Sequence, residues 1–289
     1  MRAVKDSPAD HLLKRNERAW LFLDCPLGQR RNAGGLDQQR CEEYKDPMMR
    51  KAAGTKHDID IREMPSYGFT EAGHYLLIPP STIRCWVTGR YYPSKVGRQF
   101  SKPVIQLPDP DKRLLSFMNL VEIHVLDAIR RKHDIPLEKV RTAVQYLSRQ
   151  FPSTHPLADR EFETDGLDLF ITKLGQLINV SRDGQLAMGE VLQAHLLRIE
   201  RDLSGIPVKL YPFTRKRASD EAHEEPKVVV IDPLISFGRP VLAGTGVATS
   251  VVAERYKAGE TMDELAEDYG LQRLQIEEAV RCELTLEAA

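Results

Sequence analysis

Two short segments near residue 75 carry apolar residues at helical spacing. The first predicts a helix over 71–76, for which the Thr70 hydroxyl can act as the N-cap. The second predicts a helix over 81–87. It starts at Pro80, because proline lacks the N–H that a first turn leaves unpaired, and it ends at Gly89. Two short helices separated by about three or four residues are typical of a helix-turn-helix.

The segments that follow predict a β-hairpin and two longer helices. Residues 89–110 combine aromatic and β-prone residues with Gly and Pro, as expected for a wing. Apolar residues at helical spacing then predict helices over 114–132 and 136–151, which we expect to form an antiparallel pair. Their apolar stripe can serve as the contact of a homodimer, although packing against the same domain is the more common use.

Residues 151–213 are expected to form a small α+β unit. The unit contains apolar segments at Leu167–Ile171 and Gly175–Val180, a turn at 181–184, an amphipathic helix over 186–203 and the strand-like sequence VKLYPF. The polar and charged segment that follows is expected to be a linker.

Residues 227–289 predict a compact head of three helices with a β-strand before them. The helices cover about 249–258, 262–269 and 273–284. Thr261 and Glu264 have the spacing of a capping box, and Gly270 follows where a C-terminal cap belongs.

The first 64 residues show no sustained periodicity and are expected to be mostly disordered, with order beginning at Tyr67. Alternatively, translation starts later, at Met48 or Met49, and the segment has no function. The fold class is mainly α with small β elements (α+β). The expected organisation is an extension (1–64), a winged helix-turn-helix domain with a helical pair (65–150), the α+β unit (151–213), a linker (214–226) and the three-helix head (227–289).

Length and composition exclude several classes of protein. A chain of 289 residues suggests two or three units of about 100 to 150 residues each. No apolar run approaches the roughly 18 to 20 residues of a membrane helix, and AWLFLDCPL lacks a signal cleavage site, so we expect a cytoplasmic protein without membrane contact. The four Cys residues are widely spaced, which supports neither a disulfide scaffold nor a zinc ribbon.

The net charge of −1 hides a strong asymmetry along the chain. Residues 65–150 carry 13 basic and 7 acidic side chains, a net of +6, whereas residues 219–289 carry 6 basic and 15 acidic side chains, a net of −9. The remaining segments are close to balance. This division predicts one end that binds a polyanion and one end that stays free or meets a basic partner.

The motifs of common enzymes are absent from the sequence. It contains no H-E-x-x-H, no G-x-S-x-G and no complete Walker loop. The turn at Gly244–Gly246 lacks the third small residue and the following parallel strand of a dinucleotide site. We therefore expect a protein that is not an enzyme, with no catalytic residue, no metal site and no cofactor.

Binding to double-stranded DNA is the function that the basic region favours. The start of the second short helix is the part of a recognition helix that reaches base edges, and basic and aromatic wing residues suit the phosphate backbone. The candidate DNA-binding residues are Ser81, Thr82, Arg84, Arg90, Tyr92, Lys95 and Arg98. A solvated basic surface is the simpler alternative.

Two stretches resemble a known family. YGFTEAGHYLLIPPSTIRCWVTGRYYP resembles the helix-turn-helix and wing of MerR-type regulators, in the variant found in a VapB-like class of bacterial antitoxins. VVVIDPLISFGRPVLAGTGVATSVVAERYKAGETMDELAEDYGL resembles the C-terminal domain of that class, the domain of unknown function 433, and LGQLINVSRDGQL and LYPFTR are similar to its middle part. Many relatives have Arg and Pro where this chain has Gly246 and Ala248.

The resemblance implies an antitoxin of a type II toxin-antitoxin pair. Its partners would be operator DNA, through which it represses its own operon, and a PIN-like ribonuclease toxin encoded by the adjacent gene. The alternative is a MerR-like regulator whose C-terminal part senses an effector or docks another protein.

The acidic C-terminal head is expected to bind the partner protein rather than DNA. A net charge of −9 opposes duplex binding, which depends on cationic groups, but it suits the basic cleft of a ribonuclease. Arg239 can reach the acidic site of such a toxin, although an Arg in a turn more often supports the loop. An acidic surface kept for solubility is the alternative. The candidate partner-binding residues are Phe237, Arg239, Tyr256, Glu264, Glu267 and Asp268.

Overall fold

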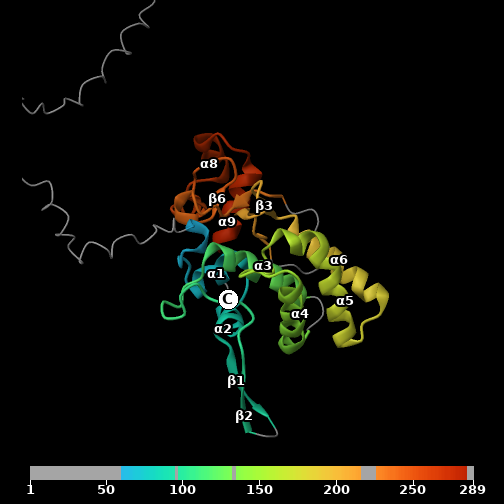
Figure 1. Ribbon diagram of the computed structural model, residues 1–289. Helices are drawn as coiled ribbons and strands as arrows, with labels where there is room; N and C mark the ends of the chain where they lie inside the picture. Colours follow the sequence, from blue (N-terminus) through green and yellow to red (C-terminus); the bar gives the residue numbers. More distant parts are fainter. Residues whose placement is uncertain (1–59, 95–96, 132–134, 216–225, 285–289) are drawn as a thin grey trace, which may run out of the picture. The chain divides into compact units, whose positions relative to one another are not determined.

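The computed structural model describes residues 60–94, 97–131, 135–215 and 226–284 (Figure 1). All of them belong to one unit of the chain, residues 56–289. Helices dominate, and the strands of the described residues form small antiparallel sheets of two strands each. The expected fold class, mainly α with small β elements, is confirmed. None of the described helices is long and apolar enough to cross a membrane.

Residues 60–64 of the expected N-terminal extension are ordered. A 3-10 helix, η2 (Ile61–Glu63), has Asp60 as its N-cap, whose carboxylate accepts a hydrogen bond from the Arg62 N–H at 2.9 Å. The Arg62 side chain also pairs with Asp202 at 3.0 Å. Because this long-range ion pair holds the turn, order begins earlier than the sequence predicts. The preceding part of the extension lies outside the described residues.

Two short helices, α1 (Phe69–Leu76) and α2 (Pro80–Thr88), form the helix-turn-helix. The N-cap of α1 is Gly68 rather than Thr70, because the Glu71 carboxylate reaches back to the Gly68 N–H at 3.2 Å. The helices therefore form as predicted, whereas the capping residue differs.

The turn between α1 and α2 depends on a glycine. A Cβ atom on Gly73 would lie 2.7 Å from the carbonyl oxygen of Ile78 and 3.0 Å from the Pro80 ring. Glycine costs a helix interior about 1 kcal/mol relative to alanine. At this position the cost is offset, because only glycine leaves room for the chain to return toward α2.

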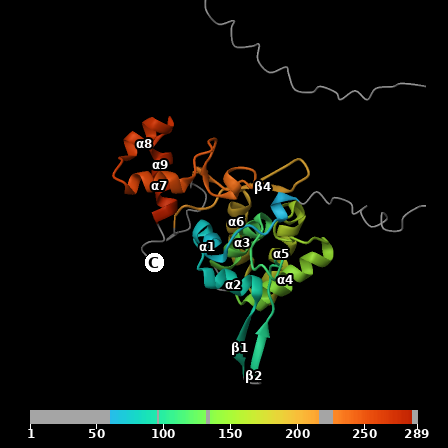
Figure 2. The same cartoon turned by 90° about the vertical axis from the view of Figure 1, so that its left-hand side faces the viewer.

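The wing is the hairpin of β1 (Arg90–Ser94) and β2 (Gly97–Ser101), and it extends from the end of α2 (Figures 1 and 2). Gly89 makes this departure possible. Its φ is +73°, and a Cβ atom there would lie 2.3 Å from the Ser101 carbonyl oxygen. Glycine adopts such a conformation without steric cost.

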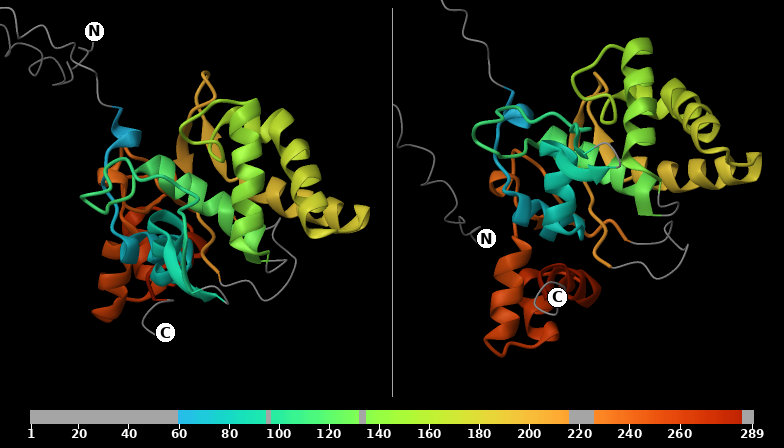
Figure 3. Two further views of the ribbon diagram at one scale, coloured as in Figure 1. Left: turned by 60° about the horizontal axis from the view of Figure 1, so that its bottom comes forward. Right: turned by 90° about the horizontal axis from the view of Figure 1, so that it is seen from below.

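The two longer helices pack on different partners. The first, α3 (Phe117–Arg131), packs on α6 (Arg182–Leu196), and α4 (Leu137–Gln150) packs on α5 (Leu167–Ile178), beside which it lies in Figures 1 and 3. The expected antiparallel pairing of α3 with α4 is therefore not the main contact. Since α3 is buried along nearly its whole length, its apolar stripe contacts the same chain rather than a second copy.

The middle unit differs from the sequence prediction in its boundaries. A π-helix, η3 (Phe162–Gly166), leads into α5, and the two expected apolar segments form this one continuous helix. Ser181, expected in a turn, is the N-cap of α6. That helix ends before the short hairpin of β3 (Ile199–Arg201) and β4 (Pro207–Leu210).

The C-terminal head consists of α7 (Thr249–Lys257), α8 (Met262–Tyr269) and α9 (Arg273–Leu284), as expected. A third small sheet pairs β5 (Val229–Val230) with β6 (Val241–Leu242), and the 3-10 turn η4 (Ser236–Gly238) lies between these strands in sequence. The head has its own apolar core, which includes Leu242, Val252, Leu265 and Ile276.

Local sequence signals are confirmed at α8. The Thr261 hydroxyl accepts a hydrogen bond from the Glu264 N–H at 3.2 Å, and the Glu264 carboxylate accepts one from the Thr261 N–H at 2.8 Å. Gly270 ends the helix in the left-handed conformation, with φ of +62°. This is the predicted capping box with its C-terminal glycine.

The expected linker begins with residues that are fixed. Thr214 is buried, and its hydroxyl donates a hydrogen bond to the Glu278 carboxylate, with which Arg215 also pairs at 2.5 Å. The linker therefore starts later than predicted, because a buried acid of α9 holds its first two residues. Residues 216–225 lie outside the described residues.

Contacts also join the head to the helix-turn-helix. Glu283 of α9 pairs with His74 of α1 at 3.0 Å and accepts a hydrogen bond from the Thr249 hydroxyl at 2.5 Å. Gly238 lies so close to Tyr67 that a Cβ atom would be 2.0 Å from the phenol oxygen. These contacts connect α1 with α9, and Tyr67, just before α1, with the loop before β6.

Candidate nucleic-acid interface

The recognition helix α2 has one buried face and one open face. Ile83 and Trp86 are buried in the main core. Ser81 and Arg84 are exposed on the opposite side, and Thr82 is half-buried at its edge. The three predicted residues therefore lie on the first turns of α2 and point away from the core, as base readout by such a helix requires.

The two faces of the wing carry different side chains, because neighbouring strand residues point in opposite directions. On one face, Tyr91 pairs with Phe100 at 4.9 Å between ring centres, and the Arg98 guanidinium lies 4.6 Å from the Tyr91 ring centre. On the other face, the Tyr92 hydroxyl donates a hydrogen bond to Gln99 at 3.0 Å. Arg98 and Tyr92 therefore start from opposite faces of the hairpin.

A groove of about 840 Å³ opens between α2, the base of the wing and the facing ends of α3 and α4. It brings together five of the seven predicted DNA-binding residues, namely Ser81, Thr82, Arg84, Arg90 and Tyr92. Arg98 is not among the lining residues; its guanidinium stacks on the Tyr91 ring instead. Lys95 lies outside the described residues.

The charged residues of the groove are mostly cations. Among the described residues they are the cations Arg84, Arg90, Lys102, Arg130 and Arg141 and one acid, Glu138. Cationic side chains along a groove displace the counterions of a nucleic-acid backbone, which is the main source of affinity for DNA. The groove can therefore hold a phosphate backbone while the open face of α2 meets the bases.

Three of these cations, Lys102, Arg130 and Arg141, are not among the candidate DNA-binding residues predicted from the sequence, and the last two lie in the longer helices. Arg130 lies in the last turn of α3, where its guanidinium donates a hydrogen bond to the Ile135 carbonyl oxygen at 2.6 Å. Arg141 lies in the first turns of α4. In the sequence both belong to ordinary amphipathic helices, and only the folded chain brings them to the wing.

The predicted partner-binding residues lie on two features of the C-terminal head. Phe237 is 95% exposed on η4, where Ser236, Phe237 and Gly238 all have positive φ values, and the neighbouring Leu234 is 78% exposed. Arg239 and Tyr256 are also exposed. The loop is thus a fixed turn that presents an aromatic side chain to solvent, as expected of an anchor for a protein partner.

The predicted acids of α8 are partly engaged within the head. Glu264 belongs to the capping box, and hydrogen bonds from the Thr261 backbone and hydroxyl hold the pKa of this carboxyl below its usual value. Asp268 pairs with Arg255 at 2.5 Å. Glu267 is exposed. The acidic surface of α8 is therefore partly neutralised by its own domain.

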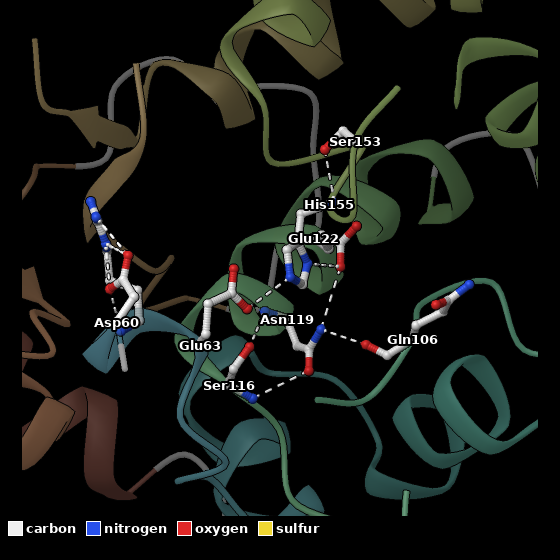
Figure 4. Close-up of polar contacts among 9 residues, drawn as sticks. Asp60, Glu63, Gln106, Ser116, Asn119, Glu122, Ser153 and His155 are labelled. Atoms are coloured by element: carbon white, nitrogen blue, oxygen red, sulfur yellow. Dashed lines mark hydrogen bonds and ion pairs between the residues drawn. The ribbon is translucent and has the colours of Figure 1, made fainter. Parts of the chain in front are cut away.

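A buried polar network lies elsewhere, under η2 (Figure 4). The His155 ring bonds to the Glu122 carboxylate through Nδ1 and to the Glu63 carboxylate through Nε2, each at 2.9 Å. Asn119 links Glu122 to the Gln106 carbonyl oxygen, to which its side chain donates a hydrogen bond at 2.9 Å. Burial alone would lower the pKa of His155, but the bonds to the two carboxylates outweigh it and raise the pKa to about 10.

The network has a structural role in the described chain. It ties η2 and the segment before η3 to the centre of α3, and its members satisfy one another. Among the described residues, no three His, Cys, Asp or Glu side chains are arranged to hold a metal ion.

Comparisons with known proteins agree with a helix-turn-helix region that is followed by a separate C-terminal region. Residues 65–144 match the family model "Putative DNA-binding HTH domain", and residues 229–281 match "Protein of unknown function (DUF433)". The first match contains α1, α2, the wing and most of α4, and the second contains most of the C-terminal head.

Similar whole proteins come from Mycobacterium tuberculosis (strain ATCC 25618 / H37Rv). "Putative antitoxin VapB45" is 29% identical over 241 residues, which cover 77% of this chain and 96% of that protein. "Uncharacterized protein Rv2308" is 24% identical over 221 residues, which cover 74% and 88%. The crystal structure of Rv2018 from Mycobacterium tuberculosis has the same fold, with a TM-score of 0.53 at 24% identity, over 75% of this chain and 98% of that one. The chain thus carries a helix-turn-helix domain and a DUF433 region, and it is similar over three quarters of its length to a protein named as an antitoxin.

Proposed function

We propose that this protein is a DNA-binding antitoxin. The basic groove between α2, the wing and α4 carries the proposal, because it places the open face of a recognition helix beside five cations. The similarity to "Putative antitoxin VapB45", of which 96% is covered, supports the antitoxin role. The protein acts in the cytoplasm as a homodimer, resembles MerR-type regulators in its head, and represses its own operon.

The partner of the C-terminal head is a PIN-like ribonuclease toxin encoded by the adjacent gene. Residues 227–289, the head, carry 6 basic and 11 acidic side chains, a net of −5, and the whole segment 219–289 carries −9; the head also presents Phe237 on an exposed turn, which suits a basic cleft with an apolar socket. A Cβ atom added to Gly246 would have no other atom within 4 Å, so a side chain would fit at this position without a clash.

DNA binding is tested by a mobility-shift titration with the DNA upstream of the protein's own reading frame. Arg84→Ala should lower the affinity for this DNA and reduce the preference over a random duplex of equal length, because an Arg that reads a base contributes about 1–3 kcal/mol of discrimination. Equal binding and equal preference by the wild type and Arg84→Ala would contradict the role of α2.

The antitoxin role is tested by co-expression with the product of the adjacent reading frame. We expect that product to arrest growth alone, and the full chain to relieve the arrest and to co-purify with it. Phe237→Ala should weaken the complex, whereas Leu186→Ala, at an exposed leucine of α6, should leave it unchanged. Failure of the wild type both to relieve the arrest and to co-purify would refute the antitoxin role and leave a DNA-binding regulator.

A further inference from the structure

The base of the wing is fixed to two separate elements. The Val104 N–H donates a hydrogen bond to the Trp86 carbonyl oxygen at 2.8 Å, which holds the end of the wing to α2. From the other side, Nη2 of Arg141 donates a hydrogen bond to the Ser101 hydroxyl at 3.0 Å and another to the Lys102 carbonyl oxygen. A single side chain of α4 thus holds the residues at which the wing returns to the domain.

The same side chain lines the basic groove. Its Nε atom is buried, and no described residue accepts a hydrogen bond from it. A buried donor without an acceptor is costly, so the protein alone does not satisfy this guanidinium. Arg141 therefore joins two features that matter for DNA binding, the direction of the wing and the charge of the groove.

We infer that Arg141 is a positioning residue for DNA recognition, which sets the angle of the wing relative to α2 and closes the groove around the sugar–phosphate backbone of a duplex. The inference rests on the proposed DNA binding and adds the residue that aligns its two contact surfaces. Phosphate contacts fix the register of a protein on DNA, and base contacts then read the sequence. A wing that turns away from α2 loses the register, so the sequence preference falls before general affinity is lost.

The experiment compares variants of the full chain on two labelled duplexes of equal length, one from the DNA upstream of the reading frame and one of random sequence. Fluorescence anisotropy gives both affinities over a series of KCl concentrations. The ratio of the two affinities measures specificity, and the slope of log K against log salt counts phosphate contacts. Far-ultraviolet circular dichroism checks that each variant is folded.

Arg141→Lys keeps the charge but lacks the planar fork that reaches both acceptors. We expect its specificity ratio to fall about tenfold with an unchanged salt slope. Arg141→Gln should lose the same specificity and also flatten the slope by about one unit. Ser101→Ala removes one wing contact without a change in charge, so part of the specificity loss should appear there. Arg149→Gln, at the other end of α4 and outside the groove, should alter neither quantity.

Wild-type specificity in both Arg141→Lys and Ser101→Ala would overturn the positioning role, and an unchanged slope in Arg141→Gln would overturn the phosphate groove. In both cases the wild type still prefers the upstream duplex, so the proposed function stands. If the wild type binds neither duplex, the proposed DNA binding fails, and the inference fails with it.

Discussion

His155 lies between two carboxylates, with Glu122 on one ring nitrogen and Glu63 on the other. Glu122 is almost fully buried, so its charge depends on the imidazolium beside it. Because the two acids stand 33 and 92 positions from the histidine, no local motif connects the three residues in the sequence. The contact forms only when η2 folds back over α3.

His155→Gln should lower the free energy of unfolding by about 3 kcal/mol, because Glu122 is left buried without a cation. Glu63→Gln should cost about 1 kcal/mol at most, since this carboxylate is 42% exposed and water replaces the lost bond. Urea unfolding of both variants measures the difference. Equal losses would show that the pair with Glu122 is no stronger than the exposed one.

The same contact predicts a pH dependence of stability. The folded pKa of His155, about 10, lies above the ordinary value of 6.5 that the unfolded chain has. The stabilisation is therefore complete below about pH 6.5 and declines as the pH rises toward 10. The stability advantage of the wild type over His155→Gln should shrink over this range in urea unfolding at several pH values. A constant advantage would refute a charged histidine.

Gly238→Ala should destabilise the protein more than Gly244→Ala. Both glycines have positive φ, +75° and +78°, which costs alanine about 1 kcal/mol. Only Gly238 has a close neighbour, the Tyr67 phenol, 2.0 Å from a Cβ position. Removal of the hydroxyl in Tyr67→Phe/Gly238→Ala should restore part of the loss. Thermal unfolding compares the variants, and equal melting temperatures for the two alanine variants would contradict the contact.

At the scale of elements, the wing separates residues that a linear sequence groups together. Arg90 and Tyr92 line the groove, whereas Arg98 stacks on Tyr91 on the opposite face. The sequence predicts a basic and aromatic hairpin, but the assignment of its faces depends on strand register, which the pairing of Tyr92 with Gln99 settles.

Arg90→Ala should weaken binding to every duplex and flatten the salt dependence by about one unit, because a groove cation is lost. Arg98→Ala should leave the salt slope unchanged, since its guanidinium faces away from the groove. The slopes come from anisotropy titrations over a series of KCl concentrations. A steeper loss in Arg98→Ala than in Arg90→Ala would reverse the assignment of the two faces.

Helix boundaries that depend on neighbouring residues could be predicted from the sequence, whereas the helix against which each one packs could not. The capping box of Thr261 and Glu264 and the break at Gly270 lie within a few residues, so the start and end of α8 follow from them. The packing of α3 on α6 and of α4 on α5 depends on long-range contacts. For the same reason Ser81, Thr82 and Arg84 could be found as one motif, whereas Arg141 could not.

At the scale of the whole molecule, basic and acidic side chains are concentrated in different regions of the chain. The groove is lined by residues of 65–150, a segment with a net charge of +6, whereas 11 of the 15 acids of residues 219–289 belong to the C-terminal head. Contacts at Glu283 and Gly238 nevertheless connect this head with the helix-turn-helix.

Glu283→Gln should weaken this connection in a pH-dependent way. Burial would raise the pKa of Glu283, but hydrogen bonds from His74 and Thr249 outweigh it and hold the pKa below the ordinary 4.5. The carboxylate thus contributes stability above about pH 4.5, and the contribution is lost as the pH falls through the lowered value. Urea unfolding at neutral pH and at several pH values below 4.5 should show the full wild-type advantage at neutral pH and its decline in the acidic range. The same wild-type advantage at all pH values would contradict a stabilising role of the ionised Glu283 carboxylate.

The wing, finally, is held near its base, so a small rotation there displaces its far end by a larger distance. Each strand has five residues, about 17 Å at the usual rise of a β-strand, and the hairpin is fixed near its base. A rotation of about 10° at the base would move the tip by about 3 Å, the length of one hydrogen bond. The hydrogen bonds at the base therefore determine the position of the far end of the hairpin, which is the end that would meet a duplex.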